Sequence, residues 1–497
     1  MKFKELLKIC NPIAVYGSEP SQMGILRTDS RDIKKNDVFI ALRGTRTDGH
    51  HFIKEVVEKE ASAIICEEAP EASKESAATI ILVKNTRELA GPVAQLLQDN
   101  PARKLKITGI TGTNGKTTVA TLVWQLLQKL DTEASLLGTV EKRVNDKREL
   151  SRLTTADAAE IAADMKKMVD AGSTHLVMEV SSHALHQQRV NGISFDVAAF
   201  TNLSLDHLDY HGSMEEYAKA KKILFNSLNH QAKAVVNADD TYADFMVDST
   251  KAEKIFFSFK GRKGVPCKIL KMNQTGLLLD IDGTTLRSPL VGDFNARNLA
   301  QAFLACRCLG FNEDNLAKVA ESCFGAPGRL EPVIKDEKPE HYPAVFVDYA
   351  HTPDALENVS ATLHALKEED QKLTIIFGCG GDRDRTKRPQ MAAIAEKFGD
   401  RVVVTSDNPR TESPESIVEE ILTGFSPDFN PEVIVSREEA IKSTILRAES
   451  SDIILVAGKG HETYQEINGE RRHFDDREIA RNALSQKNGE PEKTEVA

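Results

Sequence analysis

Short apolar runs separated by helix-like patterns occupy the first hundred residues. Three such runs, at 38–42, 61–66 and 78–83, have the length and composition of strands. Turn-forming residues at 99–102 then interrupt the pattern, and a new strand is expected to begin at Leu105. We therefore predict a small N-terminal α/β domain over residues 1–102.

After Leu105, a strand pattern leads through a glycine-rich segment into a helix with one apolar face. The residues of that face are Val119, Leu122, Val123, Leu126, Leu127 and Leu130. Further strands are predicted at 175–180 and 195–200, each followed by polar residues, as at the carboxyl ends of strands in a doubly wound sheet. This favours a central domain with a parallel sheet over residues 103–332.

The same rhythm of strands and helices returns in the last third of the chain. Strands are predicted at 345–348, 373–377, 401–405 and 453–457, and helices at 353–366, 388–398 and 414–425. These elements predict a C-terminal Rossmann-like domain over 333–485, followed by a disordered polar tail over 486–497. The expected fold class is α/β with three domains.

Composition and charge exclude several classes of function. The 497-residue chain carries a formal net charge of -11, which argues against a general nucleic-acid binder, because phosphate contacts need clustered Lys and Arg. No apolar run approaches the ~20 residues that span a bilayer, and the N-terminus lacks the pattern of a secretory signal. We therefore expect a cytoplasmic protein that binds neither nucleic acid nor membrane.

The seven cysteines include no CxxC pair. We predict buried reduced thiols rather than disulfides or a zinc site. Cys379 lies among glycines, but no partner base can be assigned to it, so we interpret it as structural.

The glycine-rich segment predicts a phosphate-binding loop. It reads Gly112, Thr113, Asn114, Gly115, Lys116, Thr117 and Thr118. Glycines permit close backbone approach, the following helix offers its N-terminal N–H groups, Lys116 supplies a positive charge, and Thr117 can bind Mg²⁺. The strict pattern requires glycine at position 110, where this chain has Ile110. The loop indicates a nucleotide but not a particular chemistry, since ATPases, kinases and ligases share it.

Two polar clusters follow the predicted strands of the central domain. Glu179 closes one strand and precedes Ser181, and the next strand leads into a segment with His207 and several carboxylates. Together they suit a divalent metal. Because Mg²⁺ prefers oxygen ligands, His207 is equally consistent with a hydrogen-bonded loop residue.

Motifs along the whole chain carry a family resemblance. They are GTNGKT, MEVSSHAL, FTNLSLDHLDYHG with the later AKAKK, GDFNARN, GAPGRLE, DYAHTPDAL, GCGGDRDRTKRP, SDNPRTESP and AGKGHETYQ. In this order, from about Thr28 to Glu462, they resemble the Mur ligases, and among these the members that add diaminopimelate. The resemblance implies an ATP-dependent amide ligase of peptidoglycan precursor synthesis, whose successive domains bind UDP, ATP and the incoming amino acid.

The resemblance also implies roles for single residues around ATP. Lys116, Glu179, His207 and Lys221 would be catalytic, and Thr117, Glu179, His207 and a carbamylated Lys221 would bind Mg²⁺. The contacts to ATP would include the phosphate loop together with Asn295, Asn298, Arg329 and Asp348. From residue type alone, Lys221 is an exposed helical lysine, Asn295 and Asn298 are helix caps, and Arg329 is a surface cation.

By the same resemblance, the substrate is UDP-N-acetylmuramoyl-L-alanyl-D-glutamate. Its uridine nucleotide would contact Thr28, Ser30, Thr45, Arg46 and Thr47. Its muramoyl-dipeptide part would contact Thr154, Thr155, Ser181, Gln187 and Arg189. The loop at 45–47 differs from the residues common in relatives.

The acceptor amino acid is predicted from Asp407, Asn408, Pro409 and Arg410. Proline fixes a turn that aims Arg410 at a cleft. meso-2,6-Diaminopimelate carries one more carboxylate than lysine, and a guanidinium binds a carboxylate through two parallel hydrogen bonds. The resemblance adds Arg383, Gly458 and Glu462 as contacts. The alternatives are L-lysine as acceptor, or Arg410 as a solvated turn residue.

The implied reaction proceeds through an acyl phosphate. ATP phosphorylates the free side-chain carboxylate of the D-glutamyl unit, and the amine of diaminopimelate then displaces phosphate. The base that deprotonates the amine is not assigned, with His211 and His351 as candidates. We expect a monomer. The competing hypothesis of an inactive nucleotide-binding regulator would require losses at Lys116, Glu179 or Lys221, and all three are present.

Overall fold

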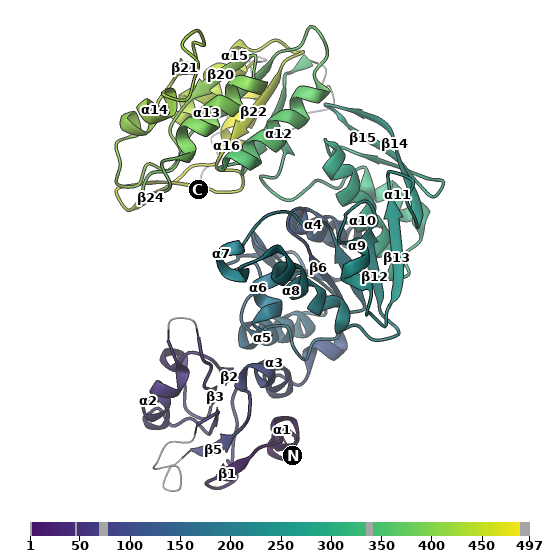
Figure 1. Cartoon of the computed structure of the whole chain (residues 1–497), viewed down its shortest axis with the longest axis vertical. Coiled ribbons are helices and arrows are strands. Elements are labelled where there is room, and N and C mark those ends of the chain that lie inside the picture. Colours follow the sequence, from purple (N-terminus) through teal and green to yellow (C-terminus); the bar gives the residue numbers. More distant parts are fainter. Residues whose placement is uncertain (1, 45–46, 69–77, 334–340, 488–497) are drawn as a thin grey trace. The chain divides into compact units, whose positions relative to one another are not determined.

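Three large β-sheets, with helices between their strands in the sequence, follow one another along the chain. The structure is a computed structural model that describes all residues except 1, 45–46, 69–77, 334–340 and 488–497. It divides into two compact units, Met1–Pro266 with Gln301–Leu316, and Cys267–Ala300 with Ala317–Ala497. In Figure 1 the sheets are found in purple, in blue to teal, and in green to yellow. In the described part of the chain, no helix is long and apolar enough to cross a membrane.

The N-terminal sheet has five strands in the order β1-β5-β4-β3-β2, with β1 antiparallel to β5 and the other pairs parallel. Alternate strand residues face two cores, so that Ile40 and Ile65 pack with α1 and α3, whereas Phe39 and Ile64 pack with α2. The three predicted strands are confirmed as β3, β4 and β5. The elements are α1 (Lys2–Cys10), β1 (Ala14–Tyr16), β2 (Leu26–Arg27), β3 (Val38–Ile40), α2 (Ile53–Glu58), β4 (Ala63–Cys66), β5 (Thr79–Leu82) and α3 (Thr86–Leu97).

The central sheet has eleven strands in the order β16-β15-β14-β13-β12-β11-β6-β10-β7-β8-β9. The strands from β13 to β7 in this order are parallel, which confirms the prediction for the middle of the sheet. Its first elements are β6 (Lys106–Thr111), α4 (Lys116–Gln128), β7 (Ala134–Leu137), β8 (Glu141–Val144), β9 (Lys147–Leu150), α5 (Ala158–Asp170), β10 (His175–Glu179), α6 (Ser182–His186) and β11 (Val197–Phe200). They continue with α7 (Leu208–His211), α8 (Met214–Asn226), β12 (Lys233–Asn237), α9 (Ala243–Val247) and β13 (Glu253–Ser258).

Antiparallel strands flank this parallel centre, which the sequence did not predict. They are β8 and β9 at one edge, and β15 (Gly276–Ile281) and β16 (Thr284–Ser288) at the other. Between β15 and the parallel centre lies β14 (Val265–Asn273), which is parallel to β13 and antiparallel to β15. Half-buried residues alternate with buried ones in β15, and exposed residues alternate with buried ones along most of β16, as in strands that bury one face more than the other. Two helices follow, α10 (Asp293–Cys308) and α11 (Glu313–Ala320).

The C-terminal sheet has six strands in the order β17-β18-β22-β19-β20-β21. Phe346 and Ile375 face a core with α12, α13 and α14, whereas Val345 and Ile376 face a core with α15 and α16, so the sheet is covered on both sides. Its elements are β17 (Glu331–Pro332), β18 (Ala344–Asp348), α12 (Pro353–Leu366), β19 (Leu373–Phe377), α13 (Lys387–Phe398), β20 (Arg401–Val404), α14 (Pro414–Leu422), β21 (Glu432–Val433), α15 (Arg437–Arg447), β22 (Ile453–Ala457) and α16 (Asp476–Lys487). A hairpin of β23 (Tyr464–Ile467) and β24 (Glu470–His473) precedes α16.

The fold can be compared with two further predictions, that the cysteines are buried reduced thiols and that the C-terminal tail is disordered. All seven cysteines have free thiols, and six of them are buried, with Cys308 half-buried. Burial raises the pKa of the Cys379 thiol to about 12, which opposes a nucleophilic role.

The disordered tail was predicted to begin at residue 486, but α16 continues through Lys487, so the first two residues of the predicted tail are helical. The helix extends this far because Leu484, near its end, still packs in the core of the C-terminal sheet. Residues 488–497 lie outside the described residues.

Candidate active site

The phosphate loop joins β6 to α4 and is bound to the loop that follows β11. The backbone N–H of Thr113 donates to the carbonyl of Asn202 at 2.8 Å, and that of Asn114 donates to the side chain of Asn202 at 3.0 Å. Gly112 has φ +149°, and a Cβ there would lie 1.8 Å from Thr201 Oγ1. Glycine is therefore required for the two loops to approach this closely.

Glu179 lies at the end of β10, beside the first turn of α4. Thr117 Oγ1 donates to Glu179 Oε2 at 2.9 Å. Thr139 donates to the same carboxylate twice, from its backbone N–H at 2.7 Å and from its hydroxyl at 3.0 Å. The Glu179 side chain is fully buried, so these hydrogen bonds hold it in one orientation.

Lys221 projects from α8 toward the phosphate loop and is 1% exposed. Its Nζ donates to the carbonyl of Gly112 at 2.7 Å and lies 4.4 Å from the centre of the Tyr217 ring. The interpretation as an exposed helical lysine is therefore wrong, because the sheet and α8 pack around the side chain. Burial, and then the charge of Lys116, lower the pKa of Lys221 well below its ordinary value.

Lys116 bends back onto its own loop. Its Nζ donates to the carbonyls of Gly112 at 3.0 Å and Thr113 at 2.8 Å. The carbonyl of Gly112 therefore accepts hydrogen bonds from both Lys116 and Lys221. The positive charge of Lys116 at the end of a strand, beside the N–H groups of a helix, forms a favourable site for phosphate.

Imidazole and phenol rings form a cluster beside these lysines. His207 adopts φ +54° before α7, and its ring meets that of His183 edge-on at 4.9 Å. His211 Nε2 lies 3.0 Å from Ser182 Oγ. Burial, and then neighbouring imidazoles, lower the pKa of His211 to about 4. His211 is therefore neutral near pH 7, but a ring with so low a pKa binds a proton weakly, which opposes the role of general base.

The oxygen donors of this site fit a magnesium ion. Thr117 and Glu179 present adjacent hard oxygens, which Mg²⁺ prefers. His207 is half-exposed on the neighbouring loop, whereas Lys221 is a ligand only if carbamylation replaces its charge. Among the described residues, no group of three or more His, Cys, Asp or Glu side chains is placed to hold a metal. Nucleotide phosphates would therefore have to supply further ligands.

The residues predicted for the muramoyl-dipeptide side are linked by hydrogen bonds. Thr155 Oγ1 donates to the carbonyl of Glu179 at 2.8 Å and accepts from the Ser181 N–H at 3.1 Å. Arg189 Nη1 donates to the carbonyl of Thr155 at 2.8 Å, and its Nη2 donates to Gln187 Oε1 at 2.7 Å. Thr154 joins the set through its hydroxyl, 3.1 Å from that of Thr139; because Thr139 donates its own proton to Glu179, Thr154 is the donor of this pair.

Two cavities adjoin this network. One of about 190 Å³ is lined by residues that include Thr28, Arg87, Gln187 and Arg189, and another of about 630 Å³ shares the last three. Thr28, which was predicted for the uridine side, therefore lies near Gln187 and Arg189, which were predicted for the muramoyl-dipeptide side. Ser30 is buried, and its carbonyl accepts from Lys59. Thr47 is exposed, and its carbonyl accepts from the N–H of Gly44, which lines the larger cavity. Thr45 and Arg46 lie outside the described residues.

Four residues predicted for the nucleotide lie in the second compact unit. Asn295 and Asn298 are not caps but buried residues within α10, where Asn298 Nδ2 donates to Asn295 Oδ1 at 3.1 Å. Arg329 is half-buried, with its guanidinium 5.1 Å from the centre of the Tyr349 ring. Burial raises the pKa of Asp348 to about 6, although the charge of Arg329 acts to lower it.

The loop after β20 places the residues predicted for the acceptor. Arg410 has φ +52°, and its Nη1 donates to the carbonyl of Gly381 at 2.8 Å. Its backbone N–H donates to the carbonyl of Glu466 at 3.1 Å, so the β23–β24 hairpin supports the turn. Arg383 is exposed nearby, and both guanidinium side chains flank Gly380.

Asp407, Asn408, Gly458 and Glu462 meet beside this turn. Asn408 Nδ2 donates to Glu462 Oε2 at 2.8 Å. A Cβ on Gly458 would lie 2.6 Å from Asp407 Oδ2, and Gly458 has φ +122°. The motifs DNPR and GKGHE therefore form one site, although about fifty residues separate them in the sequence.

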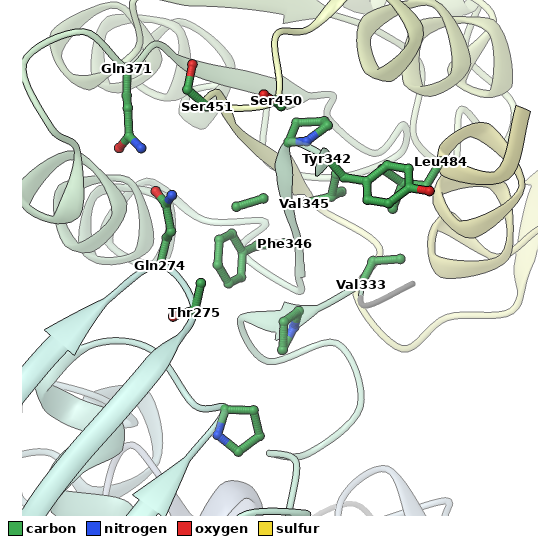
Figure 2. A pocket seen from close by; sticks show the side chains of 14 residues that line it. Gln274, Thr275, Val333, Tyr342, Val345, Phe346, Gln371, Ser450, Ser451 and Leu484 are labelled. Atoms are coloured by element: carbon green, nitrogen blue, oxygen red, sulfur yellow. The ribbon is translucent and has the colours of Figure 1, made fainter. Parts of the chain in front are cut away.

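A further cavity contains none of the predicted residues (Figure 2). It has a volume of about 410 Å³ and a mainly apolar lining that includes Val333, Val345, Phe346 and Leu484. The side chain of Gln274 also borders it, from the turn between β14 and β15. Because none of its described lining residues is charged, this cavity is not suited to phosphate chemistry.

Three supporting residues were missed by the sequence analysis. Thr139 binds Glu179 from the end of another strand, Tyr217 packs on Lys221, and Arg87 lines both cavities beside Arg189. Thr139 and Arg87 lie in segments without a recognisable motif, and only the packing of distant segments identifies them. Tyr217 directly precedes the motif AKAKK and lies four residues before Lys221 in α8, so helical spacing could have indicated it.

The fold and these sites define a P-loop nucleotide-binding enzyme built from three α/β domains. Family models for the Mur ligase family catalytic domain, the Mur ligase middle domain and the Mur ligase glutamate ligase domain match residues 23–98, 110–306 and 328–460. The chain belongs to the Mur ligase family.

Individual relatives resemble the chain over nearly its whole length. It is 42% identical to the UDP-N-acetylmuramoyl-L-alanyl-D-glutamate–2,6-diaminopimelate ligase of Cytophaga hutchinsonii, over 97% of this chain and 99% of that protein. It is 43% identical to the protein of the same name from Synechococcus elongatus, over 93% and 94%. A solved structure with this name matches with a TM-score of 0.73 at 33% identity, covering 97% of this chain and 99% of the other.

Proposed function

We propose that the protein is an ATP-dependent carboxylate–amine ligase that adds meso-2,6-diaminopimelate to UDP-N-acetylmuramoyl-L-alanyl-D-glutamate. The observation that carries the proposal is the phosphate loop beside the buried carboxylate of Glu179. It occurs in a chain that is 42% identical, almost throughout, to a ligase of that name. The reaction belongs to the synthesis of peptidoglycan precursors.

In the proposed reaction, a carboxylate oxygen of the D-glutamyl side chain attacks the γ-phosphorus of ATP, and ADP leaves. The amine of diaminopimelate then attacks the acyl phosphate and, after losing a proton, forms the amide as phosphate departs. Lys116 would neutralise charge on the transferring group, and Arg329 would contact phosphate. The base that takes this proton is not assigned, because the low pKa of His211 makes its ring a weak proton acceptor.

Magnesium would be held by Thr117, Glu179, His207 and a carbamylated Lys221. When bound, it would neutralise negative charge on the phosphates. Carbamylation requires a neutral amine, which attacks CO₂ and releases a proton. The lowered pKa of Lys221 favours that form, and the carbamate replaces a buried cation with an anion suited to a metal.

The remaining site residues are proposed by the same reasoning. The nucleotide would contact residues Gly112 to Thr118, Asn295, Asn298 and Asp348. The UDP substrate would contact Thr28, Ser30, residues 45–47, Thr154, Thr155, Ser181, Gln187 and Arg189. We also propose domain boundaries at 1–102, 103–332 and 333–485, and a monomeric enzyme.

Arg410 would select the acceptor, together with Arg383, Asp407, Asn408, Pro409, Gly458 and Glu462. Its Nη1 is bound to the carbonyl of Gly381, which fixes the guanidinium without using a carboxylate of the protein. The carboxylate that diaminopimelate has and lysine lacks would pair with this group. L-Lysine would leave the arginine without that partner.

The test measures ADP release by the full chain with ATP, Mg²⁺ and the UDP-muramoyl-dipeptide. We expect turnover with meso-diaminopimelate and little with L-lysine. Equal turnover with lysine would refute the acceptor specificity, and no turnover with either would refute the ligase function. Arg410→Lys should raise the KM for diaminopimelate about tenfold or more while leaving the KM for ATP unchanged.

A further inference from the structure

A fully buried lysine lies next to the proposed acceptor site. Lys459 has an exposed fraction of 0%, and its Nζ donates to Asn408 Oδ1 at 3.1 Å and to Glu462 Oε2 at 3.2 Å. The rings of Tyr464 and Phe474 lie 5.4 Å and 6.0 Å from the ammonium.

The ammonium fixes the orientation of two neighbouring side chains. Asn408 Oδ1 accepts from Lys459 and also from the backbone N–H of Glu466 at 2.9 Å, so its Nδ2 faces Glu462 and donates to Oε2 at 2.8 Å. Both donors to the Glu462 carboxylate thus bind the same oxygen. In the described part of the chain, no hydrogen bond reaches the other oxygen, Oε1.

A lysine at this position costs stability unless its charge is compensated. Burial of an ammonium is unfavourable, and the pairing with Glu462 offsets only part of that cost. A methionine would fill a similar volume without a charge. An interior polar group of this kind is expected where a specific geometry is needed, and here that geometry concerns Asn408 and Glu462.

We infer that Lys459 is a positioning residue for the acceptor amino acid. It holds Oε2 of Glu462 and the amide of Asn408, so that Oε1 of Glu462 is left to bind an ammonium group of the acceptor. The inference rests on the proposed function, in which Asn408 and Glu462 contact that acceptor. Lys459 itself does not touch the reacting atoms.

The competing interpretation is that Lys459 only stabilises the loop after β22. The two interpretations differ in their kinetic effects. A positioning residue affects binding of the acceptor more than binding of ATP, whereas loss of structure affects both and lowers the unfolding temperature. Lys397→Met provides a matched control. Lys397 lies on the exposed face of α13, where it pairs with Glu357 of α12.

The experiment compares the full-length wild type with Lys459→Met, Lys459→Gln, Lys459→Arg and Lys397→Met. Steady-state assays vary diaminopimelate and ATP separately, with the UDP-muramoyl-dipeptide saturating. We expect both neutral variants to raise the KM for diaminopimelate about tenfold to a hundredfold, since hydrogen bonds to charged groups are lost. The KM for ATP should stay within about twofold. The arginine variant should recover part of the loss, and Lys397→Met should behave as wild type.

Three results would overturn the inference. The first is an unchanged KM for diaminopimelate in the neutral variants, and the second is a parallel increase in the KM values for diaminopimelate and ATP. The third is failure of both neutral variants to unfold cooperatively, which would make Lys459 a structural residue. A wild type that does not use diaminopimelate would instead refute the proposed function. The two failures are therefore distinguished by the wild-type assay alone.

Discussion

Thr117 Oγ1 donates to Glu179 Oε2 at 2.9 Å, which joins the first turn of α4 to the end of β10. The contact forms because β6, which leads into the phosphate loop, pairs in parallel with β10. Carboxyl ends of adjacent parallel strands meet at one edge of the sheet. The phosphate loop and the proposed metal-binding carboxylate are therefore built by the same strand pairing.

Thr139 should prove essential for the orientation of Glu179. Thr139→Val keeps the backbone donor to Oε1 but removes the hydroxyl that donates to Oε2 at 3.0 Å. We expect kcat to fall about tenfold, and the free energy of unfolding to fall by about 1 kcal/mol, from loss of one hydrogen bond to a buried carboxylate. The Mg²⁺ concentration for half-maximal rate should rise. Assays across a magnesium titration measure both changes.

The control for this substitution is Thr174→Val, because the hydroxyl of Thr174 donates to the carbonyl of Glu133 on the exposed surface. Its kinetics should match the wild type. An unchanged magnesium requirement in Thr139→Val would show that Glu179 does not depend on this hydroxyl.

Lys221 should take up CO₂, since its lowered pKa favours the neutral amine that reacts with CO₂. Carbon-13 NMR with labelled bicarbonate is expected to show a carbamate signal in the wild type and none in Lys221→Met. Activity of this variant should fall by a factor of about 10² to 10³, as when a charge-stabilising group is removed from an active site.

Lys222→Met is the neighbouring control, because Lys222 pairs with Asp248 instead of facing the phosphate loop. It should keep both the carbamate signal and the activity. Full activity of the wild type after rigorous removal of CO₂ would argue that the amine itself suffices.

Arg410 should be required for function more than for stability. Its φ of +52° is costly for a residue with a side chain, by about 1 kcal/mol, and glycine relieves that cost while losing the bond to Gly381. In Arg410→Gly we expect an unfolding free energy within about 1 kcal/mol of the wild type and a KM for diaminopimelate raised about a hundredfold. Chemical unfolding and steady-state kinetics on the same preparation measure both. An unchanged KM would leave Arg410 as a turn residue.

Asp348 should make stability fall as the pH rises. Burial raises its pKa from 3.8 to about 6, so between these values the folded protein binds more protons than the unfolded chain. The stability contributed by the protonated form is therefore present below pH 3.8 and is lost by about pH 6.

Asp348→Asn removes this titration and leaves the others in place. The free energy of unfolding of the wild type minus that of the variant should decline by up to roughly 3 kcal/mol across this window. Urea unfolding at several pH values measures the difference. A difference that is constant or rises with pH would contradict the assigned direction.

The sequence determined the elements whose signals are local. The helix predicted at 353–366 is α12 and the strand predicted at 373–377 is β19, with the same bounds. Buried parallel strands are continuous apolar runs, and helices show a period that a few turns reveal. The phosphate loop was equally local, because its glycines, lysine and threonine act within seven consecutive residues. Family membership followed from many such motifs in order.

Only the tertiary structure decided which of these segments meet and which side chains lose contact with water. Lys221 reads as a solvated lysine until α8 packs on the phosphate loop, and Thr139 carries no motif until β7 is placed beside β10. Likewise, Lys459 becomes a buried cation only when the loops after β20 and β22 are brought together. Burial, pKa shifts and hydrogen bonds between distant segments depend on long-range packing, which the local pattern of apolar and polar residues does not encode.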